Sequence, residues 1–138
     1  MIVCENRTDT AYPQALLEDI FVYLSAKEIE LILTTDAEIQ EVNLAHRGKD
    51  KATDVLSFPL VEMEGFPLGS IMISVDMAKA VALELGHSVD DEIALLFIHG
   101  VLHLLGYDHE VDDGEMREKE AQVVRYFGLK DSLIVRND

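Results

Sequence analysis

Three of the chain's five histidines lie in one stretch, HGVLHLLGYDH, at residues 99–109. His99 and His103 are four residues apart, and residues at this spacing share one face of a helix, with Cβ atoms about 6 Å apart. Gly106 permits the helix to end in a left-handed turn, after which the chain can return and bring His109 to the same point. Three neutral imidazoles leave one position of a tetrahedral zinc ion open, which is typical of catalytic zinc sites.

The sequence therefore predicts one Zn²⁺ per chain, and Ni²⁺ or Co²⁺ are the alternatives because imidazole also suits these metals. Asp108, beside the third histidine, is predicted to orient a ligand ring by accepting a hydrogen bond from it. An ordinary turn residue is the alternative for Asp108. Core histidines that only form hydrogen bonds are the alternative for the whole cluster, and three of them at this spacing favour the metal site.

Gly100 stands where the helix of a zinc peptidase carries the glutamate that takes a proton from the metal-bound water. Glycine cannot act as that base, so this position argues against peptidase chemistry. Glycine inside a helix also costs about 1 kcal/mol relative to alanine. Its presence indicates that something approaches the backbone closely, or that the helix packs tightly on a sheet.

A second candidate cluster is a short basic segment with Arg47, Lys49 and Lys51, which together are three of the chain's 11 basic residues. It is predicted to follow the end of a helix and to precede a buried strand. Arg47 can bind a phosphate through two parallel hydrogen bonds. Lys49 and Lys51 are predicted to contact the same polyanionic substrate, and a solvated surface loop is the alternative.

Helix and strand patterns follow the order β-α-β-α-β-β-α-α-α, with capping boxes that begin at Thr35 and Ser88 and glycines after several helices. Strands are predicted at residues 1–5, 28–34, 55–60 and 70–75, the last two joined like a hairpin, and helices at residues 10–25, 35–46, 77–85, 90–105 and 113–127. This order predicts an α+β fold with a small mixed sheet flanked by about five helices. The helix at 90–105 is apolar nearly all round, so we expect it to be central, buried and the carrier of the metal ligands.

Composition places limits on location and partners. The 138 residues fit one domain, 1–138, and the single Cys4 favours a reducing compartment. Neither a signal peptide nor an apolar run long enough to span a bilayer is present, so we predict a cytoplasmic protein without membrane contact. The net charge of −16 repels nucleic acid at long range, so a polyanionic substrate requires a local basic patch.

The two clusters together resemble one known family. The stretches HRGKDKATDVLSFP and HGVLHLLGYDH, with weaker similarity in LGSIMIS, resemble the YbeY family of bacterial endoribonucleases, which act in ribosomal RNA maturation. Chain length and the order of the segments are similar too. His46, Ala52 and Ser70 depart from the family pattern, which usually has tyrosine, proline and aspartate at these positions.

The resemblance implies an α+β fold in which His99, His103 and His109 bind zinc and Arg47 is the catalytic arginine. It also implies a zinc-dependent endoribonuclease specific for single strands, acting in maturation of the 16S rRNA 3′ end and in ribosome quality control. RNA and the ribosome or its proteins are then the expected partners, and no DNA is expected. A strongly acidic chain also suits a basic ribosomal protein.

Two other classes of function remain open at the level of the sequence. A metzincin-like zinc peptidase or amidase would take its base from elsewhere, such as Glu110 or Asp108. A non-catalytic ribosome-associated module would use the metal only to stabilise its fold. For the endoribonuclease, the nucleophile is either water or the ribose 2′-hydroxyl.

Overall fold

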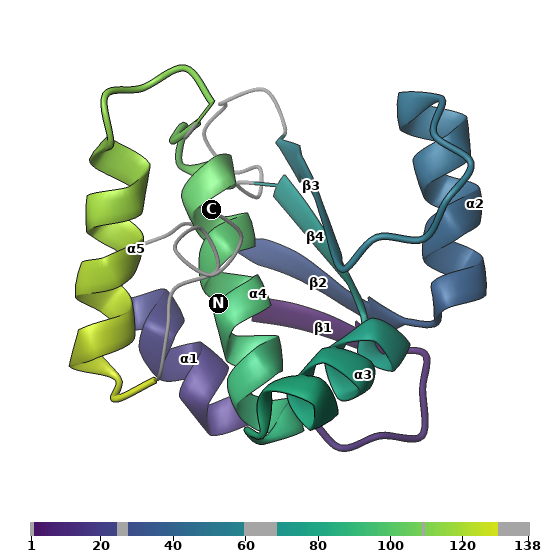
Figure 1. Cartoon of the computed structure of the whole chain (residues 1–138), viewed down its shortest axis with the longest axis horizontal. Helices are drawn as coiled ribbons and strands as arrows, with labels where there is room; N and C mark the ends of the chain where they lie inside the picture. Colours follow the sequence, from purple (N-terminus) through teal and green to yellow (C-terminus); the bar gives the residue numbers. More distant parts are fainter. Residues whose placement is uncertain (1, 25–27, 60–68, 109, 130–138) are drawn as a thin grey trace.

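The order of helices and strands predicted from the sequence is confirmed in a computed structural model of the chain (Figure 1). The structure describes all residues except 1, 25–27, 60–68, 109 and 130–138. The strands are β1 (Ile2–Asn6), β2 (Ile29–Thr34), β3 (Val55–Pro59) and β4 (Gly69–Ser74). The helices are α1 (Gln14–Tyr23), α2 (Asp36–Arg47), α3 (Val75–Leu85), α4 (Val89–Leu104) and α5 (Glu115–Tyr126).

The four strands form one mixed sheet in the order β1-β2-β4-β3. Strands β1, β2 and β4 are parallel, and β3 is antiparallel to β4, with Phe58 opposite Ser70. The predicted α+β class with a small mixed sheet is therefore confirmed. The hairpin-like connection predicted between β3 and β4 lies outside the described residues.

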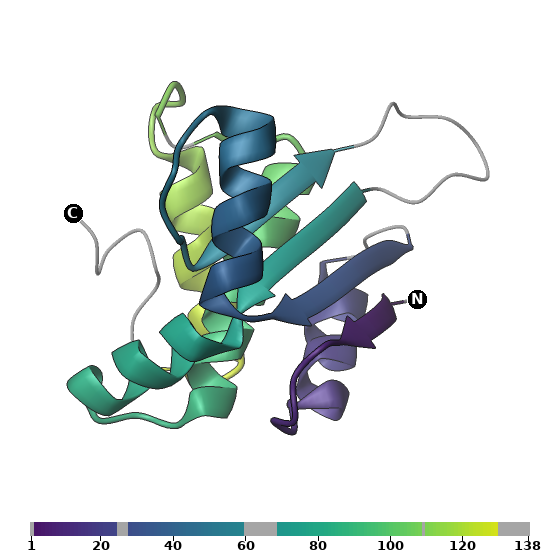
Figure 2. The ribbon, with the colours of Figure 1, turned by 90° about the vertical axis from the view of Figure 1, so that its right-hand side faces the viewer.

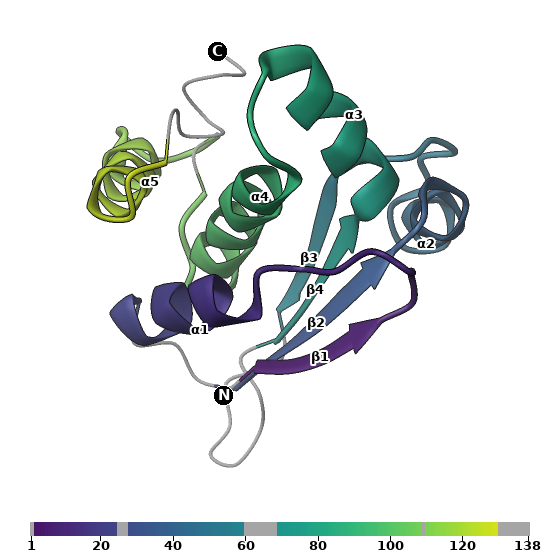
Figure 3. The ribbon, with the colours of Figure 1, turned by 90° about the horizontal axis from the view of Figure 1, so that it is seen from below.

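Helices cover both faces of the sheet (Figure 3). Helix α2 packs on one face, against β4. Helices α1 and α4 cover the other face, and α5 packs on α4 from outside. None of the helices in the described part of the chain is long and apolar enough to cross a membrane.

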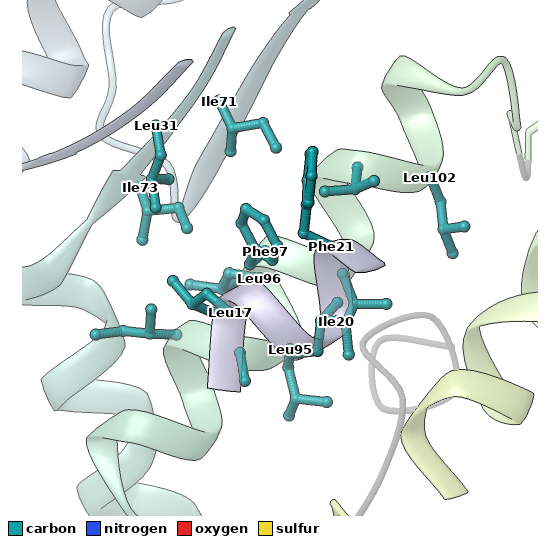
Figure 4. Packing of buried hydrophobic residues seen from close by; sticks show 14 of the residues in the cluster. Leu17, Ile20, Phe21, Leu31, Ile71, Ile73, Leu95, Leu96, Phe97 and Leu102 are labelled. Carbon is teal, nitrogen blue, oxygen red and sulfur yellow. The ribbon is translucent and has the colours of Figure 1, made fainter. Parts of the chain in front are cut away.

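Helix α4 is the centre of the core, as its apolar pattern predicted. Eleven of its 16 residues are buried. It begins at its predicted cap, where the Ser88 hydroxyl accepts a hydrogen bond from the Asp91 backbone N at 3.0 Å. Its side chains fill the space between α1 and the sheet, and each large apolar one contributes about 1.5–3 kcal/mol when fully buried. The residues labelled in this core are Leu17, Ile20, Phe21, Leu31, Ile71, Ile73, Leu95, Leu96, Phe97 and Leu102 (Figure 4).

Three helix starts differ from the prediction by two or more residues. Helix α1 begins at Gln14, four residues after the predicted 10, because Pro13 disfavours a helical conformation of the residue before it. The other two starts differ because side chains cap the backbone at other positions. Helix α3 begins two residues before the predicted 77, since the Ser74 hydroxyl accepts from the Met77 backbone N at 3.2 Å. Helix α5 begins two residues after the predicted 113. Here the Asp112 carboxylate accepts from the backbone N of Gly114 and Met116, which holds the preceding turn outside the helix.

Gly100 lies at a close contact between α4 and the sheet. A Cβ atom at this position would lie 3.0–3.3 Å from three side-chain carbons of Ile71 in β4. From the neighbouring strand β3, the Ser57 hydroxyl donates a hydrogen bond to the Gly100 carbonyl oxygen at 3.3 Å. The close approach to this glycine is therefore helix–sheet packing, and a glutamate here would point into the sheet.

We expect the substitution Gly100→Val to lower the free energy of unfolding by about 1–3 kcal/mol, because the added carbons overpack the contact with Ile71. Ala80→Val is the control, since Ala80 is exposed on α3 and loses only helix propensity, less than about 0.7 kcal/mol. Urea denaturation of both variants at equal metal content measures the difference. Equal stability of the two variants would contradict the packing described here.

Candidate metal centre

His99 and His103 present their rings to each other near the C-terminal end of α4. Their Nε2 atoms lie 3.2 Å apart, and the ring centroids are 4.7 Å apart with the planes nearly perpendicular. Both rings are half-buried. The spacing of four residues therefore brings two imidazole nitrogens to one point, as the sequence predicted.

The opposite nitrogen of each ring faces a hydrogen-bond acceptor. The Nδ1 atom of His99 lies 2.9 Å from the carboxylate of Glu120, a fully buried residue of α5. The Nδ1 atom of His103 lies 3.1 Å from the backbone carbonyl oxygen of Tyr107. A carbonyl oxygen only accepts hydrogen bonds, and a carboxylate can accept them too, so these contacts favour the tautomer with the proton of each ring on Nδ1. In this tautomer each Nε2 has a lone pair.

Two lone pairs that face each other at this distance repel unless a cation lies between them. A direct hydrogen bond would require a second proton on one ring, which makes that ring an imidazolium. Two nitrogens bound to one tetrahedral zinc ion at about 2.0–2.1 Å are about 3.3 Å apart. The observed separation of 3.2 Å fits that arrangement, so the Nε2 atoms of His99 and His103 are placed where both could bind one metal ion.

The third predicted ligand, His109, lies outside the described residues. Within the described residues, no group of three His, Cys, Asp or Glu side chains could hold a metal ion. The chain does turn back where the sequence predicted, because Gly106 has φ 101° and the Tyr107 backbone N donates to the Leu102 carbonyl oxygen at 3.0 Å. This turn brings the carbonyl of Tyr107, two residues before His109, back to His103.

Asp108 is an exposed turn residue in the structure. Its carboxylate accepts a hydrogen bond from the Glu110 backbone N at 3.0 Å. The rings of His99 and His103 instead have Glu120 and the Tyr107 carbonyl as their Nδ1 partners. That Asp108 orients a ligand ring therefore stays a prediction, and it concerns the ring of His109.

Glu120 is the site residue that sequence reasoning missed. It lies on the highly charged α5, where most acidic side chains are exposed. One signal was available, since Glu120 is four residues after Met116 and three before Val123, and both of these are fully buried. A glutamate within the apolar stripe of an amphipathic helix requires a partner, because burial of an unpaired charge is expensive.

Arg47, Lys49 and Lys51 are exposed at the C-terminal end of α2 and in the loop that follows it. Gly48 ends the helix with φ 70°, as its position predicted. The side-chain amide of the buried Asn43 donates to the Lys51 carbonyl oxygen at 3.0 Å, which ties this loop to α2. Arg47 therefore lies in the last turn of α2, and Lys49 and Lys51 lie in a loop that is held against this helix.

Strand β3 lies between this basic loop and the histidine pair. The Ser57 hydroxyl contacts Gly100 of α4, whereas the ring of the next residue, Phe58, contacts the His46 ring of α2, with centroids 5.4 Å apart. Successive strand residues point to opposite faces of a sheet, so α2 and α4 lie on opposite faces of β3. Their C-terminal ends lie at the same end of the sheet (Figures 1 and 2). Arg47 thus lies at the same end of the sheet as the histidine pair. It is on the face covered by α2, whereas the histidines are on the face covered by α4.

The structure defines a class of protein in which a mixed four-stranded sheet packs against a central buried helix, and that helix carries two imidazole rings that face each other. Residues 5–128 match the family model described as Endoribonuclease YbeY. A relative from Nautilia profundicola described as endoribonuclease YbeY is 62% identical over 138 residues, covering 100% of this chain and 99% of the relative. The chain belongs to the YbeY family, and the resemblance noted in its sequence is confirmed.

Other similar proteins agree with this assignment. An endoribonuclease YbeY from Campylobacter fetus subsp. fetus is 54% identical over 137 residues, covering 99% of this chain and 98% of the relative. A Thermotoga maritima protein with a known solution structure has a TM-score of 0.64 and 33% identity, covering 92% of this chain and 89% of that one. The fold is therefore shared with a solved relative over most of the chain.

We expect Glu120→Ala to weaken zinc binding about 10- to 100-fold, because His99 loses the acceptor that fixes its proton on Nδ1. Glu120→Gln should weaken binding less, since its amide oxygen can still accept that hydrogen bond. Glu118→Gln, at an exposed position of the same helix, is the matched control. Competition with a chromogenic chelator measures the affinities, and equal affinities of the Glu120→Ala and Glu118→Gln variants would contradict the role of Glu120.

Proposed function

We propose that this chain is a metal-dependent endoribonuclease that cleaves single-stranded RNA. Its substrate would be ribosomal RNA, during maturation of the 16S 3′ end and ribosome quality control in the cytoplasm. The observation that carries the proposal is the opposed Nε2 pair of His99 and His103, in a chain of the YbeY family. Relatives described as endoribonucleases and similar over their whole length support it.

The residues proposed to hold the metal are His99, His103 and His109, with one Zn²⁺ per chain and Ni²⁺ or Co²⁺ as alternatives. When bound, such an ion polarises a phosphoryl oxygen and lowers the pKa of bound water to about 7. Glu120 and the Tyr107 carbonyl hold the ring protons on Nδ1, so both Nε2 atoms stay available as ligands. These two acceptors thereby keep the pair in the tautomer that binds metal.

Arg47 is proposed to stabilise negative charge on the phosphate that is cleaved. Its guanidinium is always protonated, and it can donate two parallel hydrogen bonds to phosphate oxygens. Arg47 and the histidines lie on opposite faces of β3, which is an edge strand of the sheet. A substrate that contacts both must therefore pass around the free edge or the end of this strand. Pro59 ends β3 and pairs with Gly69, whose backbone lies against Leu104 in the last turn of α4. That end of β3 is therefore next to the histidine helix.

This path favours a flexible substrate. A single strand can bend around a strand end and splay its bases, whereas a duplex is rigid. The net charge of −16 opposes RNA binding elsewhere on the surface, so contact is proposed to depend on Arg47, Lys49 and Lys51. The same acidity suits docking to a basic ribosomal protein, which we propose as the partner that brings enzyme and rRNA together.

The alternative functions are less well supported by the packing around the histidines. A peptidase base at position 100 has no room, because Gly100 packs against Ile71. Glu110 and Asp108 remain the candidates for such a base. A non-catalytic metal-binding module remains the second alternative. A measurement of RNA cleavage by the metal-loaded protein distinguishes it from the endoribonuclease.

The proposed function predicts close to one equivalent of zinc in protein purified without chelator, and cleavage of labelled single-stranded RNA. A duplex of the same sequence and casein should both stay intact. Removal of the metal should abolish RNA cleavage, and added zinc should restore it. Cleavage of casein would favour the peptidase, and metal-loaded protein that cleaves neither substrate would favour the non-catalytic module.

Arg47→Ala should lower the single-turnover rate of RNA cleavage about 100- to 1000-fold, because the negative charge on the phosphate in the transition state is no longer stabilised by the guanidinium. Metal content and melting temperature should not change, since Arg47 is exposed and is not proposed as a ligand. Arg47→Lys should recover little, because lysine is a point charge. Arg125→Ala, at an exposed position on α5, is the control. Native-rate cleavage by Arg47→Ala would make Arg47 an ordinary surface residue.

A further inference from the structure

We propose that His46 and Phe58 form a binding site for one unpaired nucleobase of the RNA, beside the phosphate that Arg47 contacts. This inference rests on the proposed function and adds a contact to the base where that function invokes only phosphates. The two rings meet with centroids 5.4 Å apart and planes at 60°. They come from different elements, His46 from the last turn of α2 and Phe58 from β3.

The Phe58 ring is anchored, and it supports the ring of His46. Phe58 is partly buried and packs against a small apolar cluster between α2 and the sheet, formed by Ile39, Leu56 and Met72. His46 is exposed, and its ring contacts Phe58 edge to face. An exposed aromatic ring held by a partly buried neighbour can receive a base with little loss of side-chain entropy.

The rings of His46 and Phe58 lie between Arg47 and the histidine pair, the two groups that the proposed chemistry uses. Arg47 is the next residue after His46, and the basic loop follows it. On the other side, Ser57 precedes Phe58 and donates to the carbonyl oxygen of Gly100, the residue next to His99. An RNA strand that runs from the basic loop around β3 to the histidines therefore passes the rings of His46 and Phe58.

A nucleobase is the occupant that fits the surroundings. An otherwise acidic chain gathers three exposed cations next to the ring pair, which favours a polyanion over a peptide. Every base has a π face that can stack on an aromatic side chain, so the contact tolerates different sequences. Bases within a duplex already stack on each other and cannot enter. The site would therefore also contribute to selection of single strands.

Binding of metal-loaded protein to a short labelled RNA, at fixed salt, tests the site by fluorescence anisotropy. The RNA is used intact and as a series in which each nucleotide in turn lacks its base. His46→Ala should weaken binding of the intact RNA about 5- to 100-fold. One abasic position should weaken binding by the native protein to a similar extent and cause no further loss in His46→Ala.

Two more substitutions separate stacking from charge. His46→Phe keeps an aromatic ring without charge and should bind nearly as tightly as the native protein. His46→Lys introduces a positive charge without a ring and should bind as weakly as His46→Ala. Leu44→Ala, at a residue 48% exposed on the same helix, is the control for loss of a surface side chain. All variants should keep their metal content and melting temperature.

Unchanged affinity of His46→Ala, or rescue by lysine but not by phenylalanine, would overturn the base-binding site. If the native protein cleaves single-stranded RNA while His46→Ala binds normally, only this site is refuted and the proposed function stands. If the native protein neither binds nor cleaves any RNA, the proposed function fails and this site fails with it.

Discussion

Two imidazole nitrogens that face each other at 3.2 Å set the constraint on which the rest of this structure depends. The rings of His99 and His103 can stay in this position as neutral groups only if their protons are held on the far side. Glu120 and the Tyr107 carbonyl provide the acceptors for those protons. The proposed metal ion, bound between the two Nε2 atoms, would turn a repulsive contact into a favourable one.

The fold fixes the ring pair from three directions. Gly100 lets α4 lie directly against Ile71 of the sheet, α5 brings Glu120 under His99, and the turn at Gly106 returns the chain to His103. Burying the carboxylate of Glu120 in an apolar stripe opposes stability unless it is paired. We interpret the buried carboxylate of Glu120 as the acceptor that orients the His99 ring, since it lies 2.9 Å from Nδ1.

Strand β3 divides the functional surface into two faces that meet at one end of the sheet. The histidines belong to the α4 face, and Arg47 with the His46–Phe58 pair belongs to the α2 face. A substrate that contacts both faces must bend around the free edge or the end of this strand. The proposed preference for single strands thus follows from the architecture as well as from the chemistry of the bases.

Local signals in the sequence predicted much of this arrangement. The hydroxyl caps of Thr35 and Ser88, glycine at helix ends and apolar periodicity predicted the order of elements, and spacing predicted that His99 and His103 share a face. The partner of His99 could not be predicted in the same way, because Glu120 is 21 residues away and is buried by the packing of α5 on α4. Similarly, only the contacts of Ser57 with Gly100 and of Phe58 with His46 show that Arg47 and the histidines lie on opposite faces of β3.

The most direct test of the central claim is the tautomeric state of both rings, measured by ¹⁵N NMR of histidine-labelled protein with and without zinc. With zinc, His99 and His103 should each carry a proton on Nδ1 and show a metal-bound Nε2. The signals of the distant His87, which pairs with Glu92 at 2.8 Å, should not change. A proton on Nε2 of either ring, unchanged when zinc is added, would contradict the account.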